Sequence, residues 1–174
     1  MLPWARALNN AQNEPNTLIY SIYRTKSREP YFHWFCPIST TPAINLYVLN
    51  KSKKGITISS LADAKKHAIG TVRGDFVHDI LMENGFLSGG NEINIDVVSS
   101  DESNLNNWLN GRIDIIFMSE GSMDKRMESR NIPKDNYSIL YQLSPNELPQ
   151  NCFALNKNSD KQVVERLNKV FSER

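Results

Sequence analysis

The sequence has little of what marks several large classes of protein. Its 174 residues include only two cysteines and three histidines, and the histidines form no HxxxH or HExxH pattern, so no metal site is expected. The formal net charge is +1, which provides no general basic field for nucleic acid. The longest apolar runs, such as residues 113–118, are far shorter than a membrane span, and the first ten residues lack the apolar run of a signal peptide.

The sequence motifs of common enzymes are also missing. There is no GxSxG, no Cys-His arrangement and no carboxylate pair with catalytic spacing, and the glycines at 70 and 74 do not form GxGxxG. We therefore expect no cofactor and no catalytic activity. The two cysteines, Cys36 and Cys152, permit one disulfide, but two buried free thiols fit the sequence equally well.

The composition and the alternation of helix and strand patterns are those of a globular α/β protein. The chain is 40% hydrophobic and 22% charged, which suffices for a buried core. Residues 57–136 alternate between helix and strand patterns, which indicates an open sheet with parallel strands. The expected strands are 17–23, 31–35, 43–49, 68–72, 93–98, 113–118, 137–143 and 152–156; the expected helices are 4–11, 60–66, 75–84, 99–110, 120–130 and 159–171.

In open α/β sheets, ligands bind at the carboxyl ends of strands, near the N-termini of helices. This rule selects the turn after residues 68–72, where Gly74 allows the backbone to enter a helix and Arg73 favours an anion. An ordinary strand-to-helix turn is the alternative. Ser119 and Glu120 follow the strand 113–118 and should emerge at the same edge; Ser119 could contact a ligand, cap the next helix, or do both.

A second candidate region is residues 21–37, where arginines stand beside a dense aromatic run. The guanidinium fork of arginine suits a carboxylate or phosphate, and a neighbouring aromatic wall would bury the apolar part of an organic anion. The alternative is that Arg24 and Arg28 are surface groups paired with Glu29 or Glu14. The candidate ligand-binding residues here are Tyr20, Ser21, Arg24, Arg28 and Trp34.

Four segments together resemble a known family. They are "TKSREPYFHWF" (25–35) with its T-x-x-R, "AIGTVRGDF" (68–76), "LNNWLNGRIDIIFMSE" (105–120) and "FALNKNSDKQVVERLNKVF" (153–171). Their content, order and spacing are similar to those of the family 3 bacterial solute-binding proteins, the periplasmic type II binding proteins of ABC transporters. The resemblance covers nearly the whole chain.

The resemblance implies a periplasmic binding protein-like II fold, with two lobes of open α/β sheet and a ligand held between them. Lobe one would comprise residues 1–49 and 141–174, and lobe two residues 50–140. The chain begins at a helix that follows the opening strand, helix and strand of the family, so lobe one is expected to be incomplete at its N-terminus. The bare sheet edge that results would invite a homodimer. The implied location is the periplasm.

The resemblance also implies roles for individual residues. Arg28 matches the arginine that grips the carboxylate of the ligand, Ser21 a serine on the preceding strand, and Asp75 and Phe76 the lobe-two loop. The acidic residue that holds an ammonium group in amino-acid binders falls at Ser119, which is not acidic. An organic anion held by Arg28 and Arg73 is therefore expected, unless Asp75 or Glu120 replaces the missing carboxylate.

The expected function is capture of a small polar or anionic ligand, as the receptor of an ABC importer with a permease as partner. One alternative is a ligand-sensing domain of a signalling protein with the same fold. Another is a cyclohexadienyl dehydratase-like enzyme, in which Glu120 would be the cleft acid. A chain that binds nothing, because part of the cleft is missing, is the remaining alternative.

Overall fold

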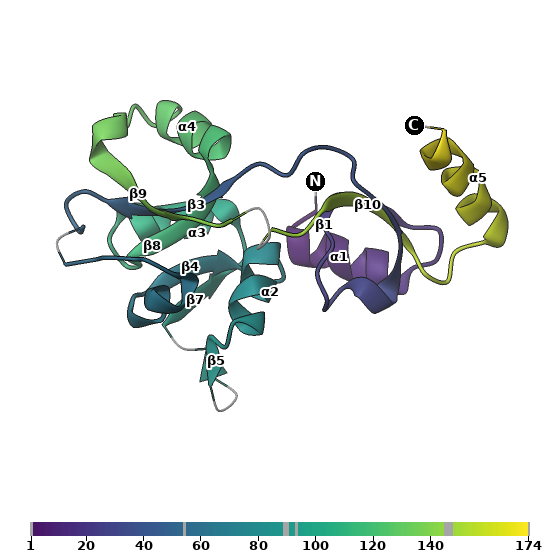
Figure 1. Cartoon of the computed structure of the whole chain (residues 1–174), viewed down its shortest axis with the longest axis horizontal. Coiled ribbons are helices and arrows are strands. Elements are labelled where there is room, and N and C mark those ends of the chain that lie inside the picture. Colours follow the sequence, from purple (N-terminus) through teal and green to yellow (C-terminus); the bar gives the residue numbers. More distant parts are fainter. Residues whose placement is uncertain (1, 54, 89–90, 93, 145–147, 174) are drawn as a thin grey trace. The chain divides into compact units, whose positions relative to one another are not determined.

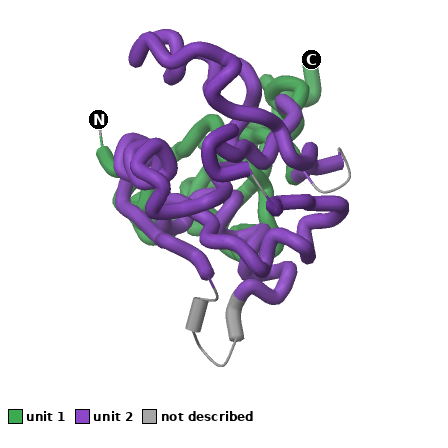
Figure 2. The backbone as a smooth tube through the Cα atoms, turned by 90° about the vertical axis from the view of Figure 1, so that its left-hand side faces the viewer, with its two compact units in different colours: residues 1–41, 149–174 green, residues 42–148 purple. Residues whose placement is uncertain are grey.

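The computed structural model describes residues 2–53, 55–88, 91–92, 94–144 and 148–173. The chain forms two compact units (Figure 2). Unit 1 comprises residues 1–41 and 149–174, and unit 2 comprises residues 42–148. In the described residues, no helix is both long enough and apolar enough to cross a membrane.

Unit 1 is built on a three-stranded antiparallel sheet in the order β1-β10-β2. The last strand in the chain, β10, therefore lies between two strands from the beginning of the chain (Figure 1). The elements of unit 1 are α1 (Trp4–Asn13), β1 (Leu18–Tyr23), η1 (Glu29–Tyr31), β2 (Phe32–Phe35), β10 (Asn151–Asn156) and α5 (Lys161–Ser172).

The two helices of unit 1 pack on opposite faces of this sheet. The apolar stripe of α1, with Leu8 and Ala11, packs against a cluster that includes Ala154 of β10. On α5, Phe171 contacts Phe35 and Phe153 instead. Because neighbouring side chains on a strand point to opposite faces, Phe153 and Ala154 define the α5 face and the α1 face of the sheet.

A disulfide joins Cys36, just after β2, to Cys152 on β10, which decides between the two alternatives that the sequence left open. Two hydrogen bonds link the segments that follow Cys36 and precede Cys152. The Ile38 amide donates to the Asn151 carbonyl at 2.9 Å, and the Thr41 hydroxyl donates to the Pro149 carbonyl at 3.2 Å. Both segments that lead to unit 2 are thus tied together within unit 1.

Unit 2 contains a five-stranded sheet in the order β7-β4-β8-β3-β9, with β7, β4 and β8 parallel and β3 and β9 antiparallel to their neighbours. A separate pair of short strands, β5 and β6, was not predicted from the sequence. The elements are β3 (Ile44–Leu49), η2 (Leu61–Lys66), β4 (Ile69–Val72), α2 (Phe76–Glu83), β5 (Leu87–Ser88), β6 (Asn91–Glu92), β7 (Ile95–Val98), α3 (Asp101–Leu109), β8 (Ile115–Ser119), α4 (Glu120–Glu128), η3 (Lys134–Asn136) and β9 (Tyr137–Gln142). The strand predicted at 93–98 begins on residue 93, which lies outside the described residues.

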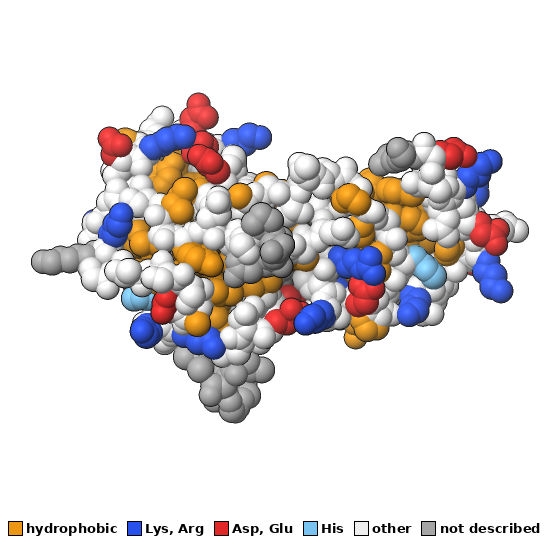
Figure 3. Space-filling view, viewed as in Figure 1, with side chains coloured by type: hydrophobic (Ala, Val, Ile, Leu, Met, Phe, Trp, Pro, Cys, Tyr) orange, Lys and Arg blue, Asp and Glu red, His pale blue; other side chains and the backbone are white. Residues whose placement is uncertain are grey.

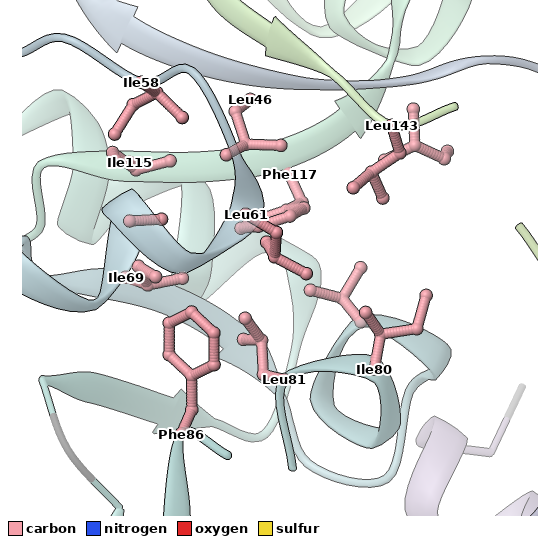
Figure 4. Packing of buried hydrophobic residues seen from close by; sticks show 13 residues of the cluster. Leu46, Ile58, Leu61, Ile69, Ile80, Leu81, Phe86, Ile115, Phe117 and Leu143 are labelled. Carbon is pink, nitrogen blue, oxygen red and sulfur yellow. The ribbon is translucent and has the colours of Figure 1, made fainter. Parts of the chain in front are cut away.

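Both faces of this sheet are covered. On one face, Leu46 and Ile115 of the sheet pack with Leu61 of η2 and Leu81 of α2, whose side chains point toward one another (Figure 4). On the other face, Ile116 packs in a second cluster with residues of α3 and α4, including Trp108, Met123 and Met127. The strand expected at 113–118 is confirmed as β8, and its nearly unbroken apolar run is typical of a strand covered on both faces.

The packing of β4 against α3 requires a residue without a side chain. A Cβ atom on Gly70 would overlap the side chains of Asn104 on α3 and Ile113 before β8. Gly70 therefore fixes how closely α3 approaches the sheet.

The boundaries of the units lie at 41/42 and 148/149, whereas the sequence divides the lobes at 49/50 and 140/141. The difference is the location of β3 and β9. Since β3 pairs with β8 on one side and β9 on the other, both strands belong to the sheet of unit 2.

Candidate functional site

The topology of unit 2 defines one edge of its sheet as a candidate ligand site. From β4 the chain passes through α2 to β7 on one side of β4, and then through α3 to β8 on the other side. In open α/β proteins, ligands bind where the strand order reverses in this way, at the carboxyl ends of the strands on either side, here β4 and β8. The helices α2, α3 and α4 all begin at this edge, so three helix N-termini provide partial positive charge there (Figure 1).

The turn between β4 and α2 carries four of the candidate residues, Arg73 to Phe76. Gly74 has φ of +71°, a conformation that residues with a side chain rarely adopt, so this turn requires glycine. The Arg73 amide donates to the Val98 carbonyl at 2.9 Å, which ties the turn to β7, and its side chain is exposed. Phe76 packs against the core cluster beneath α2.

Asp75 is the N-cap of α2. Its carboxylate accepts hydrogen bonds from the His78 amide at 2.7 Å and from the Thr71 hydroxyl at 3.0 Å. Burial raises the pKa of the Asp75 carboxyl to about 6; the nearby charge of Asp101 acts in the same direction, and the two hydrogen bonds oppose it. The protein thus places its own carboxylate at the helix N-terminus where an external anion would otherwise bind.

At the end of β8, Ser119 is the N-cap residue of α4, as one of the sequence alternatives expected. Within the described residues, however, its hydroxyl makes no capping hydrogen bond. Glu120 begins the helix and is exposed. At the neighbouring helix α3, the N-cap is Ser100, whose hydroxyl accepts from the Ser103 amide at 3.2 Å, so the helix expected from residue 99 begins at Asp101.

In unit 1, Arg28 is a buried cation. Only 2% of its surface is exposed, which excludes the alternative that it is a surface group. Its Nη1 donates to the Tyr23 carbonyl at 3.0 Å, and its guanidinium lies over the Trp4 ring, 5.7 Å from the ring centroid. A hydrogen bond and a cation–π contact together fix the plane of the guanidinium, which is what bidentate binding of a carboxylate needs.

Arg24 has a different environment. Its guanidinium donates through Nε and Nη2 to the Glu29 carboxylate, with 2.7 Å between Nε and Oε2, and lies 5.8 Å from the centroid of the Trp34 ring. The hydrogen bond from Arg24 lowers the pKa of the Glu29 carboxyl. The alternative that Arg24 pairs with Glu29 is confirmed. The ion pair borders a hollow of about 410 Å³, which is lined by Arg24, Thr25, Lys26, Glu29 and Gln150.

The two remaining candidates, Tyr20 and Ser21, contact β10. The Ser21 hydroxyl donates to Asn151 Oδ1 at 2.9 Å, next to an irregularity in the pairing of β1 with β10. Tyr20 is 69% exposed, and its ring packs on Phe153 with 5.6 Å between centroids.

Three residues of these sites were missed from the sequence. No sequence pattern around Trp4 indicates that its ring lies against Arg28. Thr71 and His78 both donate hydrogen bonds to the Asp75 carboxylate. An aspartate at the N-cap of a helix accepts from the amide three residues later, so the sequence could have indicated the contact with His78. Among the described residues, no group of histidine, cysteine and acidic side chains could hold a metal ion.

No protein-family model and no curated protein matches the chain. The chain does match solved structures. An ancestral arginine-binding protein bound to arginine has a TM-score of 0.74 and 15% identity, covering 99% of this chain and 71% of its own. A histidine kinase sensor domain with similarity to periplasmic binding proteins has a TM-score of 0.75 and 12% identity, covering 98% and 68%. An L-arginine-bound amino acid ABC transporter substrate-binding protein from Streptococcus pneumoniae has a TM-score of 0.70 and 18% identity, covering 99% and 67%.

These similarities establish the fold. The chain has the α/β architecture of the periplasmic binding protein-like proteins, as expected from its sequence, and spans roughly 70% of the length of these structures.

Proposed function

We propose that this protein captures a small polar or anionic organic ligand, as the solute receptor of an ABC importer. The observation that carries the proposal is Arg28, a buried guanidinium oriented by the Tyr23 carbonyl and the Trp4 ring. Arg28 stands where the resembling family has its carboxylate-binding arginine, and a guanidinium whose plane is fixed suits two parallel hydrogen bonds to a carboxylate.

In this proposal, each unit carries a candidate binding region of its own. In unit 1, Arg28 would bind a carboxylate. In unit 2, the strand-end edge, with Arg73 and the N-terminus of α4, would bind a polar or anionic group. An α-amino acid, such as the arginine bound by two of the similar structures, would need a carboxylate for its ammonium group. Asp75 or Glu120 would then have to supply that group, because Ser119 carries no charge.

The disulfide supports a location outside the cytoplasm. Disulfides form and persist in oxidising compartments such as the bacterial periplasm, and the Cys36–Cys152 bond lies inside the sheet unit. A periplasmic receptor would deliver its ligand to a membrane permease. The homodimer expected from the sequence stays a prediction that none of these observations tests.

A sensor domain of a signalling protein is the second candidate function. It is favoured by the similarity to the histidine kinase sensor domain, which matches this chain as well as the transport receptors do. The dehydratase-like alternative has less support, because Glu120 is exposed at the start of α4 and the similar structures are binding proteins.

Calorimetric titration of the purified chain tests the ligand class and the role of Arg28. The panel contains short mono- and dicarboxylic acids, L-arginine and L-glutamine. We expect an organic acid to bind, and Arg28→Lys, which keeps the charge but loses the fork, to weaken that binding by about tenfold or more.

The matched control is Arg24→Lys, since Arg24 is already paired with Glu29; we expect its affinity to stay close to that of the wild type. Circular dichroism verifies that each variant is folded. Tight binding of an ordinary α-amino acid with no binding of the acids would refute the anionic ligand. Unchanged affinity of a folded Arg28→Lys variant would refute the role of Arg28.

A further inference from the structure

Unit 2 has a hollow of about 390 Å³ at the other end of its sheet from the candidate site. Because β3 runs antiparallel to β8 and ends at Leu49, the turn after β3 lies at the amino end of β8. This turn, the end of α3 and the segment between α4 and β9 border the hollow, which is lined by residues 49–51, 109, 132, 135 and 136. We call it the amino-end hollow, and it shares no residue with the candidate site.

The floor of the amino-end hollow is apolar. Its aliphatic side chains are Leu49, Leu109 and Ile132, all of which belong to the second core cluster, beside Trp108. Sites for small molecules usually have volumes of about 300–1,000 Å³ and a mainly apolar lining with a few polar groups. The amino-end hollow has both properties.

The walls of the hollow are joined by Asn50. Its backbone amide donates to the Asn136 carbonyl at 2.9 Å, and its Nδ2 donates to the Asp135 carbonyl at 2.6 Å. The Ser138 hydroxyl donates to Asn50 Oδ1 at 2.5 Å. These three hydrogen bonds fix the turn after β3 to the segment before β9, so the hollow is formed before any ligand enters it.

The hollow has two opposite charges that do not pair with each other. Lys51 Nζ donates to the Leu109 carbonyl at 3.3 Å, which holds it at the end of α3 and leaves its other protons for further acceptors. Asp135 is exposed, and in the part of the chain that the structure describes its carboxylate forms no ion pair, since Lys134 binds Asp124 at 2.7 Å. Figure 3 shows acidic and basic side chains beside hydrophobic ones over α4 and the segment that follows it. A ligand that carries both charges can therefore bind both residues.

We propose that the amino-end hollow binds a short apolar peptide in its zwitterionic form. The carboxylate of the peptide binds Lys51, its ammonium group binds Asp135, and its side chains pack on the apolar floor. In a free amino acid both charges are attached to one carbon atom, whereas in a dipeptide the peptide unit separates them. Lys51 lies against the end of α3 and Asp135 lies before β9, so separated charges suit the hollow better. The proposal does not depend on Arg28 or on the ligand that Arg28 binds.

The first test is calorimetric titration of the full chain with leucyl-leucine. We expect saturable binding, and binding of glycyl-glycine that is weaker by about tenfold or more, because it has the same charges but no side chains for the floor. Lys51→Gln and Asp135→Asn should each weaken the binding of leucyl-leucine by about fivefold. Lys53→Gln is the matched control: it removes an exposed lysine of the same turn that does not line the hollow, and it should bind like the wild type.

The second test separates the two charged contacts. N-acetyl-leucyl-leucine has no ammonium group, so Asp135→Asn should not weaken its binding further. The amide of leucyl-leucine has no carboxylate, so Lys51→Gln should not weaken its binding further. General electrostatic attraction would instead let each substitution act on both capped peptides alike, and that result overturns the two contacts.

Titration of the Arg28→Lys variant distinguishes this site from the one in unit 1. Unchanged affinity of that variant for leucyl-leucine supports the amino-end hollow, whatever the ligand of Arg28 is. Loss of leucyl-leucine binding in folded Arg28→Lys, with no effect of Lys51→Gln or Asp135→Asn, overturns the proposal. So does the absence of saturable binding to the wild type, or binding of free leucine as tight as that of leucyl-leucine. Circular dichroism verifies that each variant is folded.

Discussion

Replacing Asp75 by asparagine should stabilise unit 2 at neutral pH. In the folded chain the carboxyl has a pKa of about 6, against an ordinary value of 3.8. Between these values the native state holds a proton that the unfolded chain has lost, so the free energy of unfolding falls as pH rises from about 4 to about 6. Each pKa unit corresponds to about 1.4 kcal/mol, so the buried charge costs about 3 kcal/mol above pH 6.

Asparagine keeps the oxygen that caps α2 but has no charge to desolvate. We therefore expect Asp75→Asn to match the wild type near pH 4 and to exceed it by up to about 3 kcal/mol at pH 7. The hydrogen bonds from Thr71 and His78 remain, since both need only an acceptor oxygen.

The assay is urea unfolding at a series of pH values between 4 and 7. Trp108 is the only tryptophan of unit 2, so its fluorescence reports this unit alone when Trp4 and Trp34 are replaced by phenylalanine. Asp101→Asn is the control: it removes an exposed carboxylate, so the fall in stability between pH 4 and 6 should persist. The reasoning is refuted if Asp75→Asn keeps that fall, or is less stable than the wild type at pH 7.

Three further predictions concern stability. Gly70→Ala should destabilise unit 2 by about 1–3 kcal/mol in urea unfolding, because its methyl group would overlap Asn104; a change below about 0.5 kcal/mol would contradict the packing of α3 on β4. Gly74→Ala should lose about 1 kcal/mol in the same assay through its positive φ, and an unchanged midpoint would argue against that conformation. Reduction of Cys36–Cys152 should destabilise unit 1 by about 2–4 kcal/mol and leave unchanged the urea midpoint of unit 2, which Trp108 fluorescence reports. A shift in the midpoint of unit 2 would contradict the prediction that the disulfide stabilises unit 1 alone.

The features that could be predicted from the sequence are those that short segments determine. The apolar run at 113–118 indicates a strand covered on both faces, and the structure has β8 there. The glycine at 74 indicates a turn from strand into helix, and its positive φ explains why. The four resembling segments lead to the fold because they keep their order along the chain, which is what the similar solved structures share.

The features that could not be predicted depend on residues far apart in the chain. The pairing of Cys36 with Cys152 needs β10 beside β2, and the stacking of Arg28 on Trp4 needs α1 beside the arginine loop. Burial is likewise a property of the packed molecule: identical arginine side chains become a surface ion pair at Arg24 and a buried cation at Arg28. The assignment of β3 and β9 to unit 2 follows from strand pairing, which composition does not reveal.

The position of β10 between β1 and β2 has a consequence for how the protein is made. A chain that is synthesised from its N-terminus presents β1 and β2 long before their common neighbour exists, and all of unit 2 is completed in between. Unit 2 is contiguous and has its own core, so it can fold during synthesis, whereas the sheet of unit 1 must wait for the last residues. Until then, both β1 and β2 lack the strand that lies between them. The growing chain is thus most exposed to pairing with a neighbouring copy during translation, when chains on one messenger are close together.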